Sequence, residues 1–424
     1  MKKWIQFFIF ALFCGLLIAF ISYKEAEKSH FYTNEANFKS PYPQFKSDKC
    51  GFALNFKKEQ DKIVEHNKTH FQSSLIKAPT KAAHSSTLLR TNSGLMALFF
   101  AGTREGARDV AIYQSFYNEK SNEWSEPKKI LDAVMLSKFN AKFIKKLGNP
   151  VAFKDAHNNL HLFVVGVSLG GWATSKIYQF EFDETNKPDT AFSSWGGEIE
   201  LKFIRELELG ALSNFSHLVR NTPIILENGG FILPIYHELA RKYPLLAFFD
   251  EKGVLLYTKR INLLKNQLQP SLAWLNQSDC LAFFRNHKAY ENTAFLQSCE
   301  NKANIWQKPI KTNLKNYDSS SVLLSLMIKN EAGELQNELL LVHNDGEKGA
   351  VRSKLSLFWL KNKENGEFIK LFTLDNAEEV SYPAVLLDLN ALNISYTFDR
   401  KMIKMQRVSV LSIQNAIDKV REKQ

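Results

Sequence analysis

The chain has 424 residues, of which 55 are Lys or Arg and 44 are Asp or Glu, so its formal net charge is +11. Apolar residues make up 45% and charged residues 23%, an ordinary globular composition that excludes global disorder, and the excess positive charge suggests an anionic partner. Four cysteines over this length exclude a small disulfide-built scaffold, and neither a CxxC nor an HExxH motif for zinc or redox chemistry occurs.

The N-terminus has the pattern of an export segment. Met1-Lys2-Lys3 precedes an apolar run from Trp4 to Ile21, whose one strongly polar member is Gln6. As a helix, these 18 residues would span about 27 Å, enough to cross a bilayer, and the two lysines favour a cytoplasmic N-terminus. We therefore expect residues 1–23 to be a membrane anchor that leaves the rest of the chain outside the cytoplasm. A cleaved signal peptide is the alternative, which would make the protein secreted.

Residues 24–70 are polar, rich in Lys and Asn, and contain Pro41 and Pro43. This composition is typical of a tether between an anchor and a folded domain. We therefore expect the folded domain to cover residues 71–424.

The remaining sequence repeats one design six times. Each copy has a polar or proline-marked start, an apolar strand, a short turn, and a second apolar strand. The copies start near His84, Asn149, Asn221, Gln269, Ser319 and Tyr382. Their spacing of roughly 50 to 70 residues suits a four-stranded unit and predicts an all-β, six-bladed β-propeller. A pair of β-sandwiches is the alternative. Ile413, Ile417 and Val420 have helical spacing, which predicts a short C-terminal helix.

Hairpin geometry predicts which end of this propeller binds a ligand. In an antiparallel hairpin, the start of the first strand and the end of the second lie at the same end. The residues at this end are polar, aromatic and cationic, namely His84, Asn149, Asn221, Gln269, Tyr382, Arg104, His237, Arg285, His343 and Arg400. The turn ends carry Asn, Ser, Gly and Gln. The asymmetry predicts an anionic or sugar-like ligand at the first end. Nucleic acid is disfavoured, because the basic residues form no runs with interleaved aromatics.

Cys280 and Cys299 flank a predicted hairpin centred near Ala289 and Tyr290, so they could lie opposite each other. In an oxidising compartment such a pair can form a disulfide.

Several stretches occur together in an order that belongs to a known family. They are His84-Ser85-Ser86-Thr87, Gly102–Gly106 with Asp109, Gly148-Asn149-Pro150, Gln269-Pro270-Ser271, Arg352–Leu357 and Ser381–Val385. Together they resemble the sialidase superfamily of six-bladed propellers, in particular bacterial sialidase-like proteins with BNR repeats. The family's Ser-x-Asp-x-Gly-x-x-Trp turns survive only in altered form before Trp124 and Trp306, and we expect both tryptophans to pack inside blades.

The resemblance implies a glycoside hydrolase that removes a terminal acidic sugar, such as sialic acid, without a cofactor or a catalytic metal. Arg285 and Arg352 resemble the second and third arginines that bind the sugar carboxylate, for which a guanidinium is well shaped. Tyr382 resembles the family's nucleophile, and a neutral nucleophile avoids repulsion by that carboxylate. Asp109 resembles the acid/base residue, and Arg104 is expected to line the same pocket.

Two positions depart from the family pattern. His84 stands where the family has its first arginine, and Gln269 stands where it has the glutamate that activates the tyrosine. A glutamine cannot accept the phenolic proton, and a histidine carries only a fraction of a charge at neutral pH. Two functions therefore stay open: a hydrolase for acidic sugars, and a catalytically inactive propeller that binds an acidic glycan or a partner protein. Ion pairs and buried hydrogen bonds without function are the alternative for each of these side chains.

Overall fold

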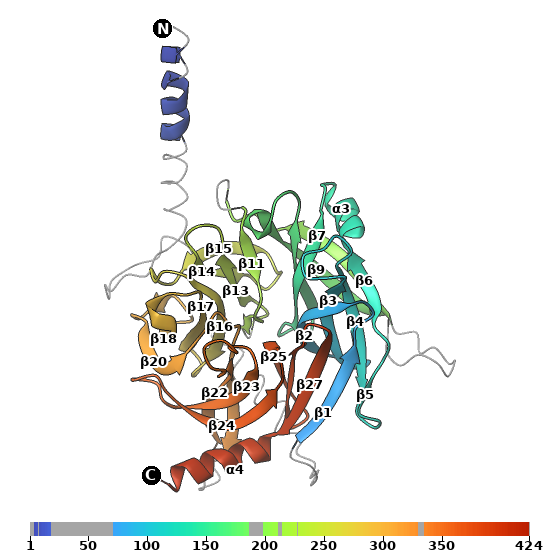
Figure 1. Cartoon of the computed structure of the whole chain (residues 1–424), viewed down its shortest axis with the longest axis vertical. Coiled ribbons are helices and arrows are strands. Elements are labelled where there is room, and N and C mark those ends of the chain that lie inside the picture. The colour runs from blue at the N-terminus through green and yellow to red at the C-terminus, as the bar shows by residue number, and fades with distance from the viewer. Residues whose placement is uncertain are drawn as a thin grey trace.

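The computed structural model describes residues 4–6, 8–17, 71–185, 198–210, 214–226, 228–329 and 335–423. From residue 71 onward the strands form six antiparallel sheets that follow one another around a common axis in chain order (Figure 1). The predicted all-β, six-bladed propeller is therefore confirmed.

The strands of the first three blades are as follows, from the innermost outward. Blade 1 contains β2 (Ala82–Thr91), β3 (Gly94–Gly102), β4 (Ala111–Asn118), β5 (Glu123–Trp124) and β6 (Lys128–Asp132). Blade 2 contains β7 (Lys146–Lys154), β8 (Leu160–Val167), β9 (Ser175–Thr185) and β10 (Glu198–Glu206). Blade 3 contains β11 (His217–Val219) and β12 (Ile224–Ile225), then β13 (Phe231–His237), β14 (Tyr243–Phe249) and β15 (Leu255–Arg260).

The last three blades follow the same plan. Blade 4 contains β16 (Gln267–Trp274), β17 (Cys280–Asn286), β18 (Thr293–Glu300), β19 (Ile305–Trp306) and β20 (Ile310–Lys315). Blade 5 contains β21 (Val322–Lys329), β22 (Leu335–Asn344), β23 (Lys354–Asn362) and β24 (Glu367–Asn376). Blade 6 contains β25 (Val380–Asp388), β26 (Ala391–Phe398), β27 (Met402–Ser409) and β1 (Phe71–Lys77). The short helices are α3 (Ala133–Asn140), α4 (Val410–Arg421), η1 (Trp172–Thr174) and η2 (Tyr290–Asn292).

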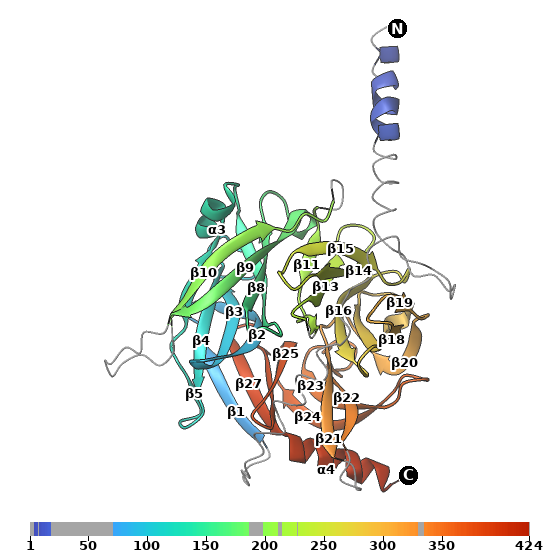
Figure 2. The ribbon, with the colours of Figure 1, turned by 180° about the vertical axis from the view of Figure 1, so that it is seen from behind.

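Strand β1 joins the two ends of the ring. It pairs antiparallel with β27 from Phe71 opposite Val408 to Lys77 opposite Met402, and thus forms the outer edge of the last blade (Figure 2). The indole of Trp124 in blade 1 donates a hydrogen bond to Ser74 Oγ of this strand. The repeat pattern did not predict this pairing, because β1 belongs to none of the six hairpins.

The innermost strand of blade 3 differs from the prediction. The sequence predicted a strand that starts near Asn221, but the inner edge starts at His217 and is divided into β11 and β12, which both pair with β13. Pro223 lies in the interruption and has no backbone N–H to donate to a neighbouring strand.

The blades pack through large apolar side chains. Between blades 2 and 3, for example, Phe163, Phe231 and Phe249 are all fully buried, and the rings of Phe231 and Phe249 stack with their centroids 4.5 Å apart. Such close packing makes the ring of blades a rigid support for the residues at its axis.

Two smaller expectations are confirmed. Cys280 lies opposite Cys299 on neighbouring strands, and the two form a disulfide with their Cα atoms 4.9 Å apart. The C-terminal helix α4 starts after Ser409, whose side chain accepts a hydrogen bond from the backbone N–H of Ser412, and it buries Ile413 and Ile417.

Residues 4–6 and 8–17 are helical. Within the described ranges, however, the helices are all too short or too polar to reach across a bilayer, so the structure gives no support to the predicted transmembrane helix. The end of the predicted anchor and the whole tether of residues 24–70 lie outside the described residues.

Candidate functional site

Four innermost strands share a β-bulge near their first residues. The pairing register shifts after His84, Gly148, Leu268 and Ser381. Ser85, Asn149, Gln269 and Tyr382, which lie inside these bulges, have positive φ angles of 52°, 37°, 46° and 55°. This conformation is uncommon for a residue as bulky as tyrosine, and a bulge re-aims a side chain away from the strand's regular alternation. The local strain thus occurs at three positions that the sequence singled out, Asn149, Gln269 and Tyr382, and at the residue after His84, as is typical of functional sites.

Tyr382, in blade 6, lies among cationic and aromatic side chains from four other blades. Its hydroxyl oxygen accepts a hydrogen bond from Arg285 Nη1 at 3.0 Å. The guanidinium carbons of Arg220, Arg285 and Arg352 lie 5.4, 5.9 and 5.5 Å from its ring centroid, and the ring of His84 lies 4.3 Å from it. The structure therefore brings together four of the seven candidate residues: His84, Arg285, Arg352 and Tyr382.

Two carboxylates hold the arginines in place. Arg285 Nε donates to Asp318 Oδ1 at 2.7 Å, while Arg352 donates to Glu379 at 3.3 Å and to the Asp318 carbonyl oxygen at 2.8 Å. Burial opposes ionisation of Asp318, yet the charge and hydrogen bond of Arg285 keep the pKa of this carboxyl below its ordinary value. The guanidinium groups are thus fixed before any ligand arrives.

Arg220 was not predicted, although it is the most buried arginine of the cluster. It is 2% exposed, and its Nη2 atom donates to the carbonyl oxygens of Tyr382 at 2.6 Å and Pro383 at 2.8 Å. Burial lowers the pKa of Arg220 to about 10, so it stays charged at neutral pH. The sequence signal that could have found it is its place immediately before Asn221, at the predicted start of the third repeat.

Asn221 acts in the same way on a second bulge. Its Nδ2 atom donates to the carbonyl oxygens of Gln269 at 3.1 Å and Pro270 at 3.0 Å. Two consecutive residues of blade 3 therefore hold the X-Pro bulges of blades 6 and 4.

Gln269 is buried and bonded to a different tyrosine. Its Nε2 atom donates to Tyr236 Oη at 3.2 Å, and Asn149 Nδ2 lies 3.5 Å from the same oxygen. Burial raises the pKa of Tyr236 well above its ordinary value, so this phenol stays neutral. Within the described residues, the hydrogen bonds of Gln269 do not include the Tyr382 hydroxyl. Tyr236 is a further member of the site that the sequence did not indicate.

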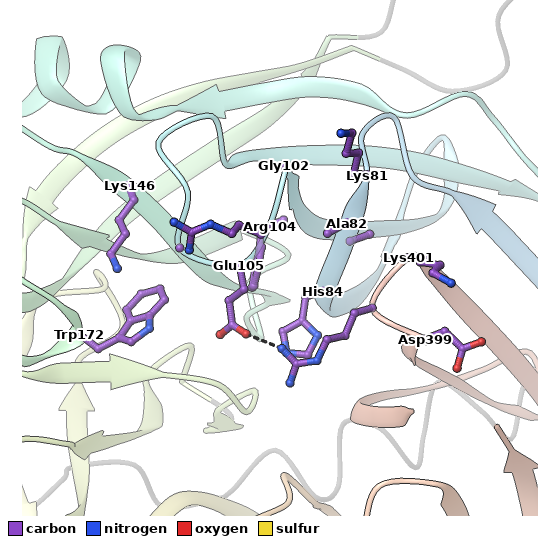
Figure 3. Close-up of a pocket in the computed structure, with 14 residues that line it drawn as sticks. Lys81, Ala82, His84, Gly102, Arg104, Glu105, Lys146, Trp172, Asp399 and Lys401 are labelled. Carbon is purple, nitrogen blue, oxygen red and sulfur yellow. Dashed lines mark hydrogen bonds and ion pairs between the residues drawn. The ribbon is translucent and has the colours of Figure 1, made fainter. Parts of the chain in front are cut away.

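A pocket of about 740 Å³ adjoins the cluster through His84 and Arg400 (Figure 3). Arg104, Glu105, Lys146 and Trp172 are among its other lining residues. The Glu105 carboxylate lies 2.9 Å from Arg400 Nη1, and Arg400 Nε also bonds Glu379 at 2.6 Å. The pocket and the Tyr382 cluster are thereby joined by one chain of ion pairs.

Asp109 is not among the residues that line this pocket. It is exposed on the loop between β3 and β4, where its carboxylate accepts hydrogen bonds from Thr103 N at 2.8 Å and Thr103 Oγ1 at 3.0 Å. The structure thus places the predicted acid near the pocket-lining loop residues Arg104 and Glu105 without bringing it to Tyr382.

The opposite end of the axis is different in character. A pocket of about 640 Å³ there is lined mainly by apolar side chains of the innermost strands, including Leu88, Leu272, Val322 and Val385. The arginine cluster is confined to the end predicted to bind a ligand.

The side chains of Trp306 and His343 are buried and hydrogen-bonded within the fold. Trp306 is 2% exposed and donates its indole N–H to the Ala303 carbonyl, which agrees with a packing role, and His343 lies between Ser321 and the Lys315 carbonyl. Within the described ranges, no three His, Cys, Asp or Glu side chains are grouped as metal ligands.

The sequence matches the model of a known protein family. The BNR repeat-like domain matches residues 93–394. The chain belongs to the BNR repeat-like family. No curated protein matches the chain.

Solved structures share the fold. A sialidase of Trypanosoma rangeli superposes with a TM-score of 0.59 at 11% identity, over 84% of this chain and 60% of that one. A Hadza microbial sialidase superposes with a TM-score of 0.56 at 13% identity, over 78% of this chain and 66% of that one. A protein of unknown function from Dyadobacter fermentans superposes with a TM-score of 0.57 at 14% identity, over 81% of this chain and 100% of that one. The BNR repeat-like chain thus corresponds to about three fifths of the trypanosomal sialidase, and at these identities the likeness shows the fold alone.

Proposed function

We propose that the protein is a sialidase-like glycoside hydrolase that acts on a terminal acidic sugar. The observation that carries this proposal is that the guanidinium groups of Arg285 and Arg352 both lie beside Tyr382. In an acidic sugar the carboxylate is next to the anomeric carbon, so the two arginines can bind the carboxylate while the tyrosine faces that carbon. The structural neighbours support the same ligand class, since the Trypanosoma rangeli sialidase has been solved in complex with sialic acid.

In the proposed reaction, Tyr382 Oη attacks the anomeric carbon while the bond to the leaving-group oxygen breaks. Asp109, the residue that the resemblance supplies, donates a proton to that oxygen. Water then gives a proton to the Asp109 carboxylate and attacks the anomeric carbon, the bond to Tyr382 Oη breaks, and the released phenolate takes a proton back from water. The phenolic proton passes to water, because Gln269 cannot accept it, and the Arg285 hydrogen bond stabilises negative charge on the attacking oxygen.

A panel of fluorogenic glycosides tests this proposal. It would contain a sialoside, a uronoside and matched neutral sugars. We expect release of the fluorophore from acidic sugars only. Turnover of neutral sugars at an equal rate would contradict the assigned role of the arginines.

The second candidate is a catalytically inactive propeller that binds an acidic glycan. It is favoured by Gln269, which donates to Tyr236 where the family would place a base, and by His84, whose pKa is lowered by burial and by the charges of the surrounding arginines. Binding of an acidic sugar without turnover, together with gain of hydrolysis in Gln269→Glu, would support this candidate.

We further propose that residues 1–23 anchor or export the chain, that residues 24–70 are a tether, and that the propeller works outside the cytoplasm. The apolar N-terminal run and the Cys280–Cys299 disulfide support this, because disulfides persist in oxidising compartments. Fractionation of cells, followed by labelling of intact cells with a membrane-impermeant reagent, would test the location.

A further inference from the structure

The pocket continues beyond His84 and Arg400 to a second cationic region (Figure 3). Arg104 comes from the loop after β3, Lys146 is the first residue of β7, and Trp172 is the first residue of η1. In Figure 3, the Arg104 guanidinium and the Lys146 ammonium lie on the same side as the Trp172 ring, whereas the Glu105 carboxylate is directed toward the other side. Lys146 Nζ lies 4.5 Å from the Trp172 ring centroid.

The positive charges of Arg104 and Lys146 repel each other. Burial lowers the pKa of Lys146, and the charges of Lys145 and Arg104 lower it further, against the opposing effect of Glu105. Glu105 itself is paired with Arg400, and across the described residues neither Arg104 nor Lys146 forms an ion pair with a carboxylate. An anionic group of a ligand placed there would relieve this repulsion.

The backbone around the region is shaped for close contact. A Cβ atom on Gly148 would lie 2.8 Å from Trp172 Cη2, so the indole packs directly on the backbone before the Asn149 bulge. Gly106 has a φ of 74°, and a Cβ atom there would lie 3.3 Å from Lys146 Nζ. An indole face beside two cations is a suitable surface for a sugar ring that carries an acidic substituent.

We propose that Arg104, Lys146 and Trp172 form a second subsite, which binds the sugar next to the terminal one and selects for an anionic group on it. The preferred ligand is then an acidic oligosaccharide with two negative groups, one at Arg285 and Arg352 and one at Arg104 and Lys146. This inference rests on the proposed function, because the Tyr382 cluster is taken as the first subsite. The second anion can be the carboxylate of another acidic sugar or a sulfate ester.

Isothermal titration of the full chain tests the inference with three ligands: sialyllactose, sialyllactose sulfated on the neighbouring sugar, and disialyllactose. We expect at least one of the two dianionic ligands to bind about tenfold more tightly than sialyllactose at low salt, with a smaller advantage at high salt. Whichever of the two binds more tightly identifies the chemistry of the second anion.

Lys146→Gln and Arg104→Gln should each reduce the preference for the dianionic ligand to about threefold or less. Arg104 lies on an exposed loop, so its variant tests the subsite even if Lys146→Gln disturbs the start of β7. Lys252→Gln, in the turn between β14 and β15 at the opposite end, is the matched control and should change none of the affinities. Equal affinity for all three ligands, or an unchanged preference in both variants, would overturn the second subsite. Failure of all three ligands to bind would instead overturn the proposed function.

Discussion

Arg285 donates a hydrogen bond to the Tyr382 hydroxyl across 3.0 Å and thereby links the fourth blade to the sixth. The same guanidinium bonds Asp318 at 2.7 Å, so its orientation does not depend on a ligand. A group fixed in this way loses little conformational entropy when an anion binds.

Arg285→Lys should weaken the binding of an acidic sugar by about tenfold or more. A lysine carries the charge but cannot bond Asp318 and Tyr382 with one planar fork. Titration with sialyllactose would measure the loss, with the exposed Arg241→Lys as control. Equal affinity of the two variants would show that Arg285 is a structural ion pair.

Arg220→Met should lower the free energy of unfolding by about 3 kcal/mol, because it leaves the buried carbonyls of Tyr382 and Pro383 without their charged donor. Asn221→Ala removes a neutral donor from the equivalent carbonyls of Gln269 and Pro270 and should cost only about 1 kcal/mol. Urea unfolding measures both values. An Arg220→Met protein as stable as the wild type would refute the proposed support of the Tyr382 bulge.

Asp109→Asn should lower kcat by about a hundredfold if Asp109 is the proton donor. Glu105→Gln should mainly raise KM, because the Glu105 carboxylate is bound to Arg400 at the pocket wall. The pH–rate profiles of the two variants separate the roles, since loss of the acid also removes the alkaline limb. If Glu105→Gln instead lowered kcat and removed the alkaline limb, while Asp109→Asn only raised KM, Glu105 would be the proton donor.

Stability should fall in mild acid through His343. This residue is 1% exposed, and burial lowers its pKa to about 4, whereas an unfolded histidine titrates near ~6.5. The unfolded chain therefore binds a proton that the folded chain rejects, so the stabilisation present above pH ~6.5 is lost as the pH falls toward 4. This residue should account for about 2 kcal/mol of the difference between pH 7 and pH 5 in urea unfolding. His343→Gln should remove this part of the difference in unfolding free energy between pH 7 and pH 5. If the pH dependence of the variant equals that of the wild type, His343 is not the titrating group.

The disulfide should contribute about 3 kcal/mol, because it closes a segment with a sequence separation of 19 residues. Cys280→Ala combined with Cys299→Ala should lower the unfolding midpoint accordingly. Cys14→Ser, which changes a free cysteine, should leave the midpoint unchanged. A double variant of wild-type stability would show that the bond is dispensable.

The fold could be predicted from the sequence because the hairpin pattern is local and recurs six times. What the pattern could not give was the partner of Phe71–Lys77, since pairing with β27 joins segments more than 300 residues apart and leaves no local signal. The interruption after β11 was missed for a similar reason, as Arg220 and Asn221 bond distant bulges instead of continuing a strand.

The site was predictable in part. Tyr382 and Gln269 precede prolines at strand starts, and Arg285 ends a strand at the same end, so periodicity alone brought them to one face. Arg220 and Tyr236 each lie one residue before a predicted strand boundary, at Asn221 and His237, but their place in the site depends on burial that strand boundaries do not reveal. The resemblance implied that residue 269 contacts Tyr382, but the Gln269 side chain bonds Tyr236. The spacing of strands does not determine the direction in which a side chain points.

Hydrolysis of a fluorogenic sialoside by the wild type and by Tyr382→Phe tests the central claim most directly. The substitution removes only the hydroxyl that Arg285 contacts, so the fold and the arginine cluster should persist. The account predicts release of the fluorophore by the wild type and a fall in kcat of at least about a hundredfold in the variant, with the acidic sugar still bound. Equal turnover by the two proteins would contradict it.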